Sequence, residues 1–276
     1  MSMRTTIPAY SDIFIRYLLS DESNKDLLLS FINAVNEDYD IPTIAEVEIL
    51  NPFNLKTFQV DKETVIDVKA KDETGRLYDI EVQATGNAAF KHRSLYYWAK
   101  LYSSQLGEAQ RYAELRPTIC INLLNFKLIE EFDDVHACFV LRESRHPDLI
   151  LTDHLVLHYV QLPRFVKEAG YASALEQWLA FLKYEGVKEE AMRTILENPV
   201  MQKAHEKYKA FTQDERMIDL YEARMKMQRD RLSAEADARQ EGLQQGIQQG
   251  IQQSQREIAV NMLNSGLDVS QVAQYT

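Results

Sequence analysis

The sequence has few of the residues and motifs that mark secreted, membrane-spanning or nucleotide-hydrolysing proteins. Its 276 residues include two cysteines, Cys120 and Cys138, and both lie in apolar runs typical of reduced core residues. No run approaches the roughly 20 apolar residues of a membrane span, and the first residues have no signal-peptide character. We therefore expect a cytoplasmic protein that does not associate with a membrane.

The sequence also lacks an overall basic charge. Its 31 Lys and Arg against 42 Asp and Glu give a formal net charge of -11, which argues against a protein that coats nucleic acid indiscriminately. One segment departs from this balance, because residues 86–116 carry five basic and two acidic side chains. Neither a glycine-rich phosphate loop nor a Gly-x-Ser-x-Gly motif is present, so nucleotide-hydrolase and serine-hydrolase chemistry have no support.

The stretch 64–84, TVIDVKAKDETGRLYDIEVQA, predicts two strands joined by a tight turn. Apolar and polar residues alternate on both sides of Gly75, which suits the left-handed position of a three-residue loop. If Asp72 pairs with Arg76, counting back along the ladder sets Asp67 opposite Glu81. Side chains alternate across a strand, so Asp67 and Lys69 would share one face of the sheet with Asp79, Glu81 and Gln83.

Such a concentration of carboxylates favours a bound divalent cation. Like charges directly opposite each other destabilise a sheet, and hard oxygen ligands are those that Mg²⁺ prefers. Asp67, Glu81 and the main-chain carbonyl of Val82 would supply these ligands. The alternative is a solvated acidic face without chemistry, and the pattern alone does not exclude it.

The order of the predicted elements indicates an α/β fold. Two helices over residues 11–36 come first, then strands at 44–50 and in the hairpin, a helix at about 90–106, and further strands at 117–124, 137–141 and 154–160. This order predicts a mixed sheet flanked by helices. We expect a core domain over residues 1–165, a helical region over 166–235 and a tail over 236–276.

The tail carries the internal repeat Gly242-Leu-Gln-Gln, Gly246-Ile-Gln-Gln, Gly250-Ile-Gln-Gln. Its apolar residues recur every four positions, close to the helical period, and would form a stripe for a partner helix. Three glycines cost roughly 1 kcal/mol each relative to alanine, so a helix here is weak alone. The tail is therefore either a helix that forms with a partner, for example in a homo-oligomer, or a flexible segment.

An Asp on one strand and Glu-x-Gln on its neighbour resemble the core of the PD-(D/E)XK nucleases. The phrases NKDLLLSFINAV, IDVKAKDETGRLYDIEVQ, HRSLYYWAKLYSSQL and LTDHLVLHYVQL, together with the repeat tail, resemble the Rpn family of recombination-promoting nucleases, also described as transposase-like. The resemblance implies a restriction-endonuclease-like fold, a DNA endonuclease that depends on Mg²⁺ or Mn²⁺, and a role in DNA recombination or mobile elements.

Carried over residue by residue, the resemblance implies that Asp67 and Glu81 hold the metal. Gln83 stands where the family pattern usually has lysine, and a neutral amide can hydrogen-bond but cannot supply a positive charge. We hypothesise that Lys69, about 6.6 Å along the strand from Asp67, takes over part of that role. Alternatively, Lys69 extends over the sheet surface without a role in chemistry.

Two further groups of residues are candidates for the site. Arg93 and Lys100 lie on one face of the helix that follows the hairpin, where they would contact DNA phosphates or form an ordinary solvated face. Asp12, in a segment that resembles the family's Asp-x-x-Phe-Lys stretch with Arg16 replacing lysine, would complete the metal site or cap the first helix.

The glutamine leaves a second function open. The chain would then be a catalytically degenerate module that binds DNA or a protein and assembles through its C-terminal tail. The endonuclease is the interpretation that the sequence favours, with Asp67, Glu81, Gln83 and Lys69 as its catalytic residues.

Overall fold

We describe a computed structural model of the chain, which covers residues 6–53, 67–86, 89–107 and 110–275. Helices α1 (Asp12–Leu19) and α2 (Lys25–Glu37) precede strands β1 (Val47–Ile49), β2 (Asp67–Asp72) and β3 (Leu77–Gln83). Helix α4 (Phe90–Ser103) is followed by β4 (Thr118–Leu124), β5 (His136–Arg142) and β6 (Ile150–Gln161). The rest is helical, with α5 (Ala174–Tyr184), α6 (Glu189–Ile195), α7 (Pro199–Gln213), α8 (Glu215–Asn264) and α9 (Val269–Tyr275).

The strands form one mixed sheet in the order β1-β2-β3-β4-β6-β5. The β1–β2, β2–β3 and β5–β6 pairs are antiparallel, whereas β3–β4 and β4–β6 are parallel. Strand β4 lies inside the sheet and every one of its residues is buried, as its continuous apolar run predicts. The predicted α/β fold with a mixed sheet is therefore confirmed.

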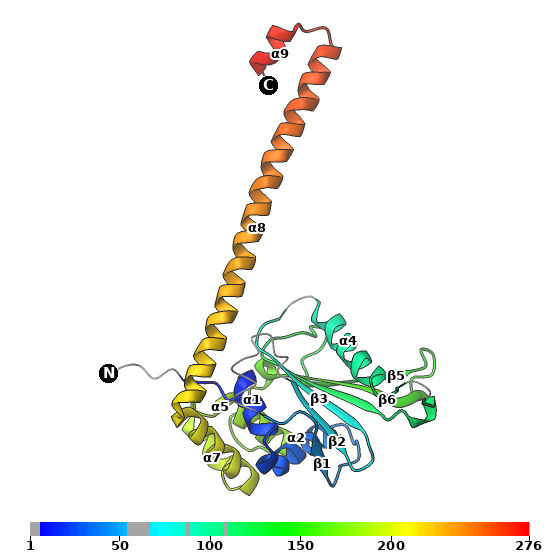
Figure 1. Ribbon diagram of the computed structural model, residues 1–276, viewed down its shortest axis with the longest axis vertical. Coiled ribbons are helices and arrows are strands. Elements are labelled where there is room, and N and C mark those ends of the chain that lie inside the picture. The colour runs from blue at the N-terminus through cyan, green and yellow to red at the C-terminus, as the bar shows by residue number, and fades with distance from the viewer. Residues whose placement is uncertain (1–5, 54–66, 87–88, 108–109, 276) are drawn as a thin grey trace, which may run out of the picture. The chain divides into compact units, whose positions relative to one another are not determined.

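Helices cover both faces of this sheet (Figure 1). Helix α4 lies on one face, where the indole Nε1 of Trp98 donates to the carbonyl of Thr118 at 2.9 Å and the hydroxyls of Ser94 and Tyr159 lie 2.7 Å apart. Helices α1 and α2 lie on the other face, together with α5 (Figure 1). Because register alternates the side chains, Asp67, Glu81 and Gln83 all belong to the α4 face.

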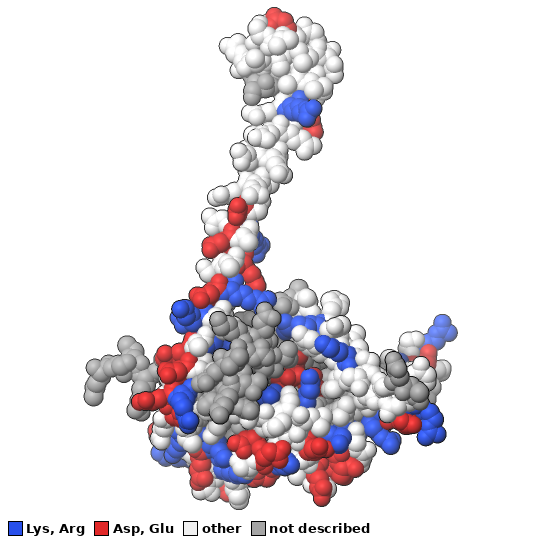
Figure 2. Space-filling view, in the orientation of Figure 1, with Lys and Arg blue, Asp and Glu red and all other residues white. Residues whose placement is uncertain are grey.

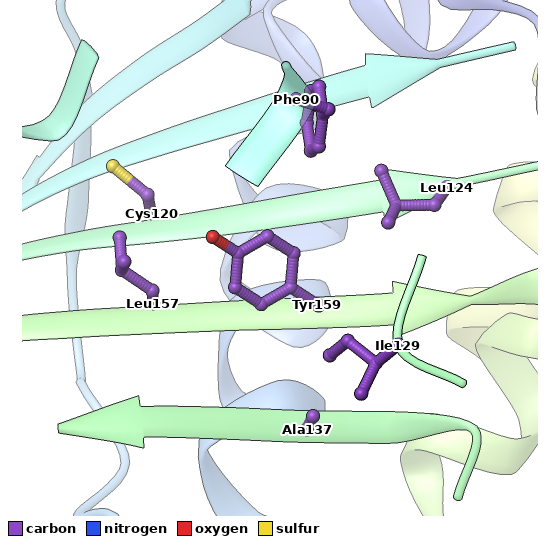
Figure 3. Packing of buried hydrophobic residues seen from close by; sticks show 7 residues of the cluster. All are labelled: Phe90, Cys120, Leu124, Ile129, Ala137, Leu157 and Tyr159. Atoms are coloured by element: carbon purple, nitrogen blue, oxygen red, sulfur yellow. The ribbon is translucent and has the colours of Figure 1, made fainter. Parts of the chain in front are cut away.

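The core beneath α4 is an apolar cluster that begins at the first residue of that helix. Phe90 is fully buried and packs with residues of β4, β5 and β6 (Figure 3). The members are Phe90, Cys120, Leu124, Ile129, Ala137, Leu157 and Tyr159. This cluster fixes the N-terminal end of α4 against the sheet, next to the ends of β3 and β4.

Helix ends follow the capping residues in the sequence. Ser11 caps α1 by accepting from the main-chain N–H of Phe14, so Asp12 is not the N-cap and lies in the first turn instead. Asn198 caps α7, which has a proline in its first turn. Helix α4 ends at Ser103, before the predicted boundary at residue 106, and Ser104 is its C-cap.

The chain divides into two compact units, residues 1–218 and 219–276. The first contains the sheet and helices α1 to α7, and the second contains most of α8, with α9. The division at residues 165 and 235 made from the sequence stays a prediction. Over the described residues, the repeat tail is helical, and none of the helices there has the length and apolar character needed to cross a bilayer.

Two glycines in left-handed conformations allow a test of packing near the chain's N-terminal segment. Gly186 (φ 72°) follows α5, and a Cβ there would overlap the hydroxyl of Tyr208, which donates to the carbonyl of Ile7 at 2.6 Å. Gly170 (φ 67°) has open space around it. We expect Gly170→Ala to lower the free energy of unfolding by about 1 kcal/mol through backbone strain alone.

We expect Gly186→Ala to cost roughly 1 kcal/mol more, because the Tyr208 hydrogen bond is displaced as well. Urea unfolding of the two variants measures the difference. Equal losses would show that Tyr208 moves aside at no cost and that its bond to Ile7 contributes nothing.

Candidate metal-dependent active site

The site begins with the turn that joins β2 to β3. Gly75 has φ 88°, the left-handed conformation expected of it. The Asp72 carboxylate accepts from the main-chain N–H groups of Thr74 and Arg76, both at 2.9 Å, and the Asp72 N–H donates to the Arg76 carbonyl at 3.0 Å. These bonds hold the hairpin in one register.

That register places Asp67 opposite Glu81 and Lys69 opposite Asp79, as the sequence predicts. The side chains point to the α4 face, and Asp67, Asp79 and Glu81 are only 5%, 3% and 5% exposed. The predicted strand began at residue 64, and residues 64–66 lie outside the described part of the chain. Burial excludes the solvated acidic face that was the alternative for these three carboxylates.

Burial and mutual repulsion change how two of these carboxylates titrate. Burial, with the neighbouring charges of Asp67 and Glu81, raises the pKa of Asp79 to about 8. Burial also raises the pKa of Glu81 to about 7, although Arg93 counteracts the rise. Without a cation, the site therefore retains protons at neutral pH.

Lys69 and Arg16 supply positive charge beside Asp67. The Lys69 ammonium lies 2.9 Å from Asp67 Oδ2, and the Arg16 guanidinium lies 3.9 Å from Asp67 Oδ1. Burial lowers the pKa of Lys69, but the hydrogen bond and charge of Asp67 outweigh it and the pKa is raised. Lys69 is therefore a cation held in the site, and its side chain remains 38% exposed.

Arg16 and Asn51 form a support for Asp67 that sequence reasoning missed. Arg16 reaches from α1 to donate to the main-chain carbonyls of Asp67 and, at 2.7 Å, of Asn51. The Asn51 amide donates to the Asp67 carbonyl at 3.2 Å and accepts the Lys69 N–H at 2.7 Å. The start of β2 is thus fixed by side chains that are distant in sequence, and the one available signal was Arg16 at the position of the family's lysine.

Gln83 and Arg93, predicted as separate site residues, contact each other. Arg93 Nη2 donates to Gln83 Oε1 at 2.5 Å, and the guanidinium also lies 4.9 Å from the centre of the Phe90 ring. Arg93 is half-buried and acts on the charge of Glu81. The position that usually carries a lysine is therefore occupied by the Gln83 amide, which accepts a hydrogen bond from the Arg93 guanidinium.

The other two predicted residues, Asp12 and Lys100, lie on helices α1 and α4. Asp12 lies one helical turn before Arg16 on α1 and its carboxylate accepts from the N–H of Ile13 at 2.8 Å. Lys100 is exposed on α4, two turns after Arg93 on the same side of the helix. The roles of Asp12 in metal binding and of Lys100 in phosphate binding stay predictions.

The buried oxygens are suited to a cation. Glu81 Oε2 and Asp79 Oδ1 are buried and have no hydrogen-bond partner among the described residues, and such atoms are costly unless a ligand satisfies them. Within the same part of the chain, no group of three or more His, Cys, Asp or Glu side chains is arranged to hold a metal ion. A divalent cation would therefore depend on two carboxylates together with main-chain and water oxygens, which suits Mg²⁺.

A comparison with protein families assigns the chain to one family. A family model described as PD-(D/E)XK nuclease family transposase matches residues 9–238. The chain belongs to this family. The resemblance predicted from the sequence is confirmed at this level, and a PD-(D/E)XK nuclease family transposase has a nuclease or mobile-element role in which DNA is the substrate. The match includes the sheet, α4 and every site residue named above.

Two further comparisons gave nothing. Neither a curated protein nor a solved structure matches the chain. The assignment to the PD-(D/E)XK nuclease family transposases therefore depends on the family model, with which the fold and the paired carboxylates agree.

The raised pKa of Asp79 predicts how stability changes with pH. Below about pH 4 the folded and unfolded chains both hold the Asp79 proton. As pH rises toward 8 the unfolded chain releases it first, so the free energy of unfolding falls by up to about 1.4 kcal/mol per pH unit. We expect Asp79→Asn, which has no proton to release, to gain stability relative to the parent as pH rises from 4 to 8 in EDTA.

Urea unfolding at several pH values, with metal removed by EDTA, measures this gain. Asp148→Asn is the control, because it removes an exposed carboxylate of the β5–β6 connection. Parallel stability curves for Asp79→Asn and the parent would contradict the raised pKa.

Proposed function

We propose that the chain is a metal-dependent DNA endonuclease that hydrolyses phosphodiester bonds during recombination or the movement of mobile elements. The observation that supports this proposal is the opposed pair Asp67 and Glu81, both buried, with an unsatisfied oxygen on Glu81. Burying two like charges at directly opposed positions of the ladder costs free energy that a divalent cation would offset.

Asp67, Glu81 and the carbonyl of Val82 are the residues that would hold Mg²⁺ or Mn²⁺. When bound, such an ion lowers the pKa of an attacking water and neutralises charge on the phosphate. The protein's own contribution is to fix the carboxylates, and the Arg16 and Asn51 contacts to the Asp67 main chain support this role.

The role of the usual lysine would be divided among Lys69, Gln83 and Arg93. Lys69 bears the positive charge, and its contact with Asp67 Oδ2 keeps it at the edge of the carboxylate cluster. Gln83 would orient the water or a phosphate oxygen through its amide. Arg93 holds that amide and adds a second positive charge on the same face.

Contacts with DNA would extend from this cluster along α4. Arg93 and Lys100 lie on one side of the helix, so a phosphodiester backbone could contact both. The chain's net charge of -11 favours a localised contact of this kind over general binding.

The test is nicking of a supercoiled plasmid in Mg²⁺ or Mn²⁺. We expect Asp67→Asn and Glu81→Gln to reduce the nicking rate at least 100-fold, because each removes a charged ligand. EDTA should abolish nicking in the parent. DNA binding by gel shift in Ca²⁺ is the second readout. A parent that binds DNA but never nicks it, in any divalent metal, would contradict hydrolysis and favour the degenerate binding module.

A separate variant tests the role of Lys69. We expect Lys69→Met to lower the nicking rate 10- to 100-fold, because its charge would act on the transition state. Lys71→Met is the matched control, since Lys71 lies two residues further on β2 and pairs with Glu48 at 2.7 Å instead. Nicking by Lys69→Met at the parental rate would end the idea that Lys69 replaces the missing lysine.

A further inference from the structure

Helix α8 carries an exposed apolar stripe between residues 232 and 262. Its three central members, Leu243, Ile247 and Ile251, are 64%, 56% and 55% exposed. The stripe positions, in order, are Leu232, Ala236, Gln240, Leu243, Ile247, Ile251, Ser254, Ile258 and Met262. Seven of the nine are apolar, and a stripe of this length on a solvated helix needs a covering partner.

The spacing of the stripe identifies the kind of partner. Its positions are separated by 4, 4 and 3 residues in turn, a repeat of 11 residues or about 3.67 per helical turn. That value is close to the natural helical period, so the stripe stays on one side of α8 over its whole length. The partner that matches it is another long helix.

The spacing of the stripe positions is symmetric about Ile247. Counting outward, Leu243 is matched by Ile251, Gln240 by Ser254, Ala236 by Ile258 and Leu232 by Met262. A two-fold axis at Ile247 would therefore set two copies of the stripe against each other in antiparallel orientation. Such an interface is isologous, so the same patch serves both subunits.

Packing volumes favour this orientation over a parallel one. In the antiparallel pair, the small Ala236 faces the large Ile258 of the partner subunit, which suits close packing at that position. In a parallel pair in register, Ala236 would face its own copy and leave a gap. Gln240 would face Ser254 of the partner subunit, so the two polar positions can hydrogen-bond to each other.

The positions of the charged residues on α8 support the same antiparallel register. Residues 242–255 carry no charge and form a white band on α8 between charged segments (Figure 2). Arg239 and Glu257 lie on the same flank of the stripe, 8 residues before and 10 residues after Ile247. In the antiparallel pair Arg239 therefore comes within about two residues, roughly 3 Å along the helix, of Glu257 of the partner subunit. Two ion pairs result, one at each end of the band.

The helical glycines fit a close approach of two backbones. Gly246 and Gly250 border the stripe on the Arg239 flank, and a Cβ added at either would meet no atom within 4 Å. They cost helix stability without improving any contact within the chain. A second helix on this flank could approach where side chains are absent.

We propose that the occupant of the stripe is a second copy of this chain, joined through α8 as an antiparallel pair with its two-fold axis at Ile247. The dimer does not depend on the proposed nuclease chemistry. Residue 232 of one copy and residue 232 of the other lie at opposite ends of the pair, on the order of 45 Å apart.

Light scattering of the full chain tests whether the pair forms. At micromolar concentration we expect a mass twice the chain's 32.0 kDa, and a monomer for Ile247→Glu, which places two like charges on the axis. Gln249→Glu is the matched control, because it adds the same charge on the opposite side of the helix. A monomeric parent, or a dimeric Ile247→Glu variant, would overturn the proposal.

Cysteine crosslinking tests the orientation, in a chain whose Cys120 and Cys138 are replaced by alanine. Under mild oxidation we expect no dimer bond in Ala236→Cys alone or in Ile258→Cys alone, and a covalent dimer when the two are mixed. Crosslinking within each single variant would show that the pair is parallel and would contradict a two-fold axis at Ile247.

A charge exchange provides a second measurement of the same register. We expect Arg239→Glu and Glu257→Arg each to weaken dimerisation at low salt at least fivefold, and the double variant to restore the parental dissociation constant. No restoration would show that the two side chains do not meet across the interface.

Discussion

The site depends on the repulsion between two carboxylates that the antiparallel ladder forces to face each other. Asp67 and Glu81 occupy directly opposed positions on β2 and β3, and both are buried. The fold reduces this repulsion by three means: the Lys69 ammonium, the Arg16 guanidinium and retained protons on Asp79 and Glu81. The Lys69 side chain remains 38% exposed, so of these three it is the one that solvent reaches most readily.

The sheet keeps the two carboxylates together because β3 is fixed on both sides. Its antiparallel partner β2 is tied to the first helix through Arg16, and its parallel partner β4 is covered by α4 and the Phe90 cluster. Arg93 extends from the same helix to Gln83. A displacement of α4 would therefore change the charge around Glu81.

Local rules were sufficient to predict the hairpin and the facing pair. A glycine loop sets the register, and alternation then places Asp67, Asp79 and Glu81 on one face. The buried character of β4 followed in the same way from its apolar run. Helices α1, α2 and α4 were predictable too, although α4 ends at Ser103 and not at the predicted residue 106.

The long-range contacts of the site could not be predicted from the sequence. Asn51 is 16 residues from Asp67 and Arg16 is 51 residues away, and no periodicity links positions that meet only through tertiary folding. The bond between Gln83 and Arg93 was missed for a related reason, since each residue was identified by its own motif. The depth of the carboxylates, which decides their protonation, depends on the tertiary packing around β2 and β3 and has no local signal.

One buried thiol has a practical consequence for studying this sheet. Cys120 faces Asp79 across β3 and β4, and burial together with the three carboxylates raises its pKa well above the ordinary value. Alkylating reagents react with the thiolate, so Cys120 becomes reactive only when the strands separate and water enters. Its labelling rate in the native protein would therefore report the free energy of opening at the centre of the sheet, beside the candidate site, without any introduced probe.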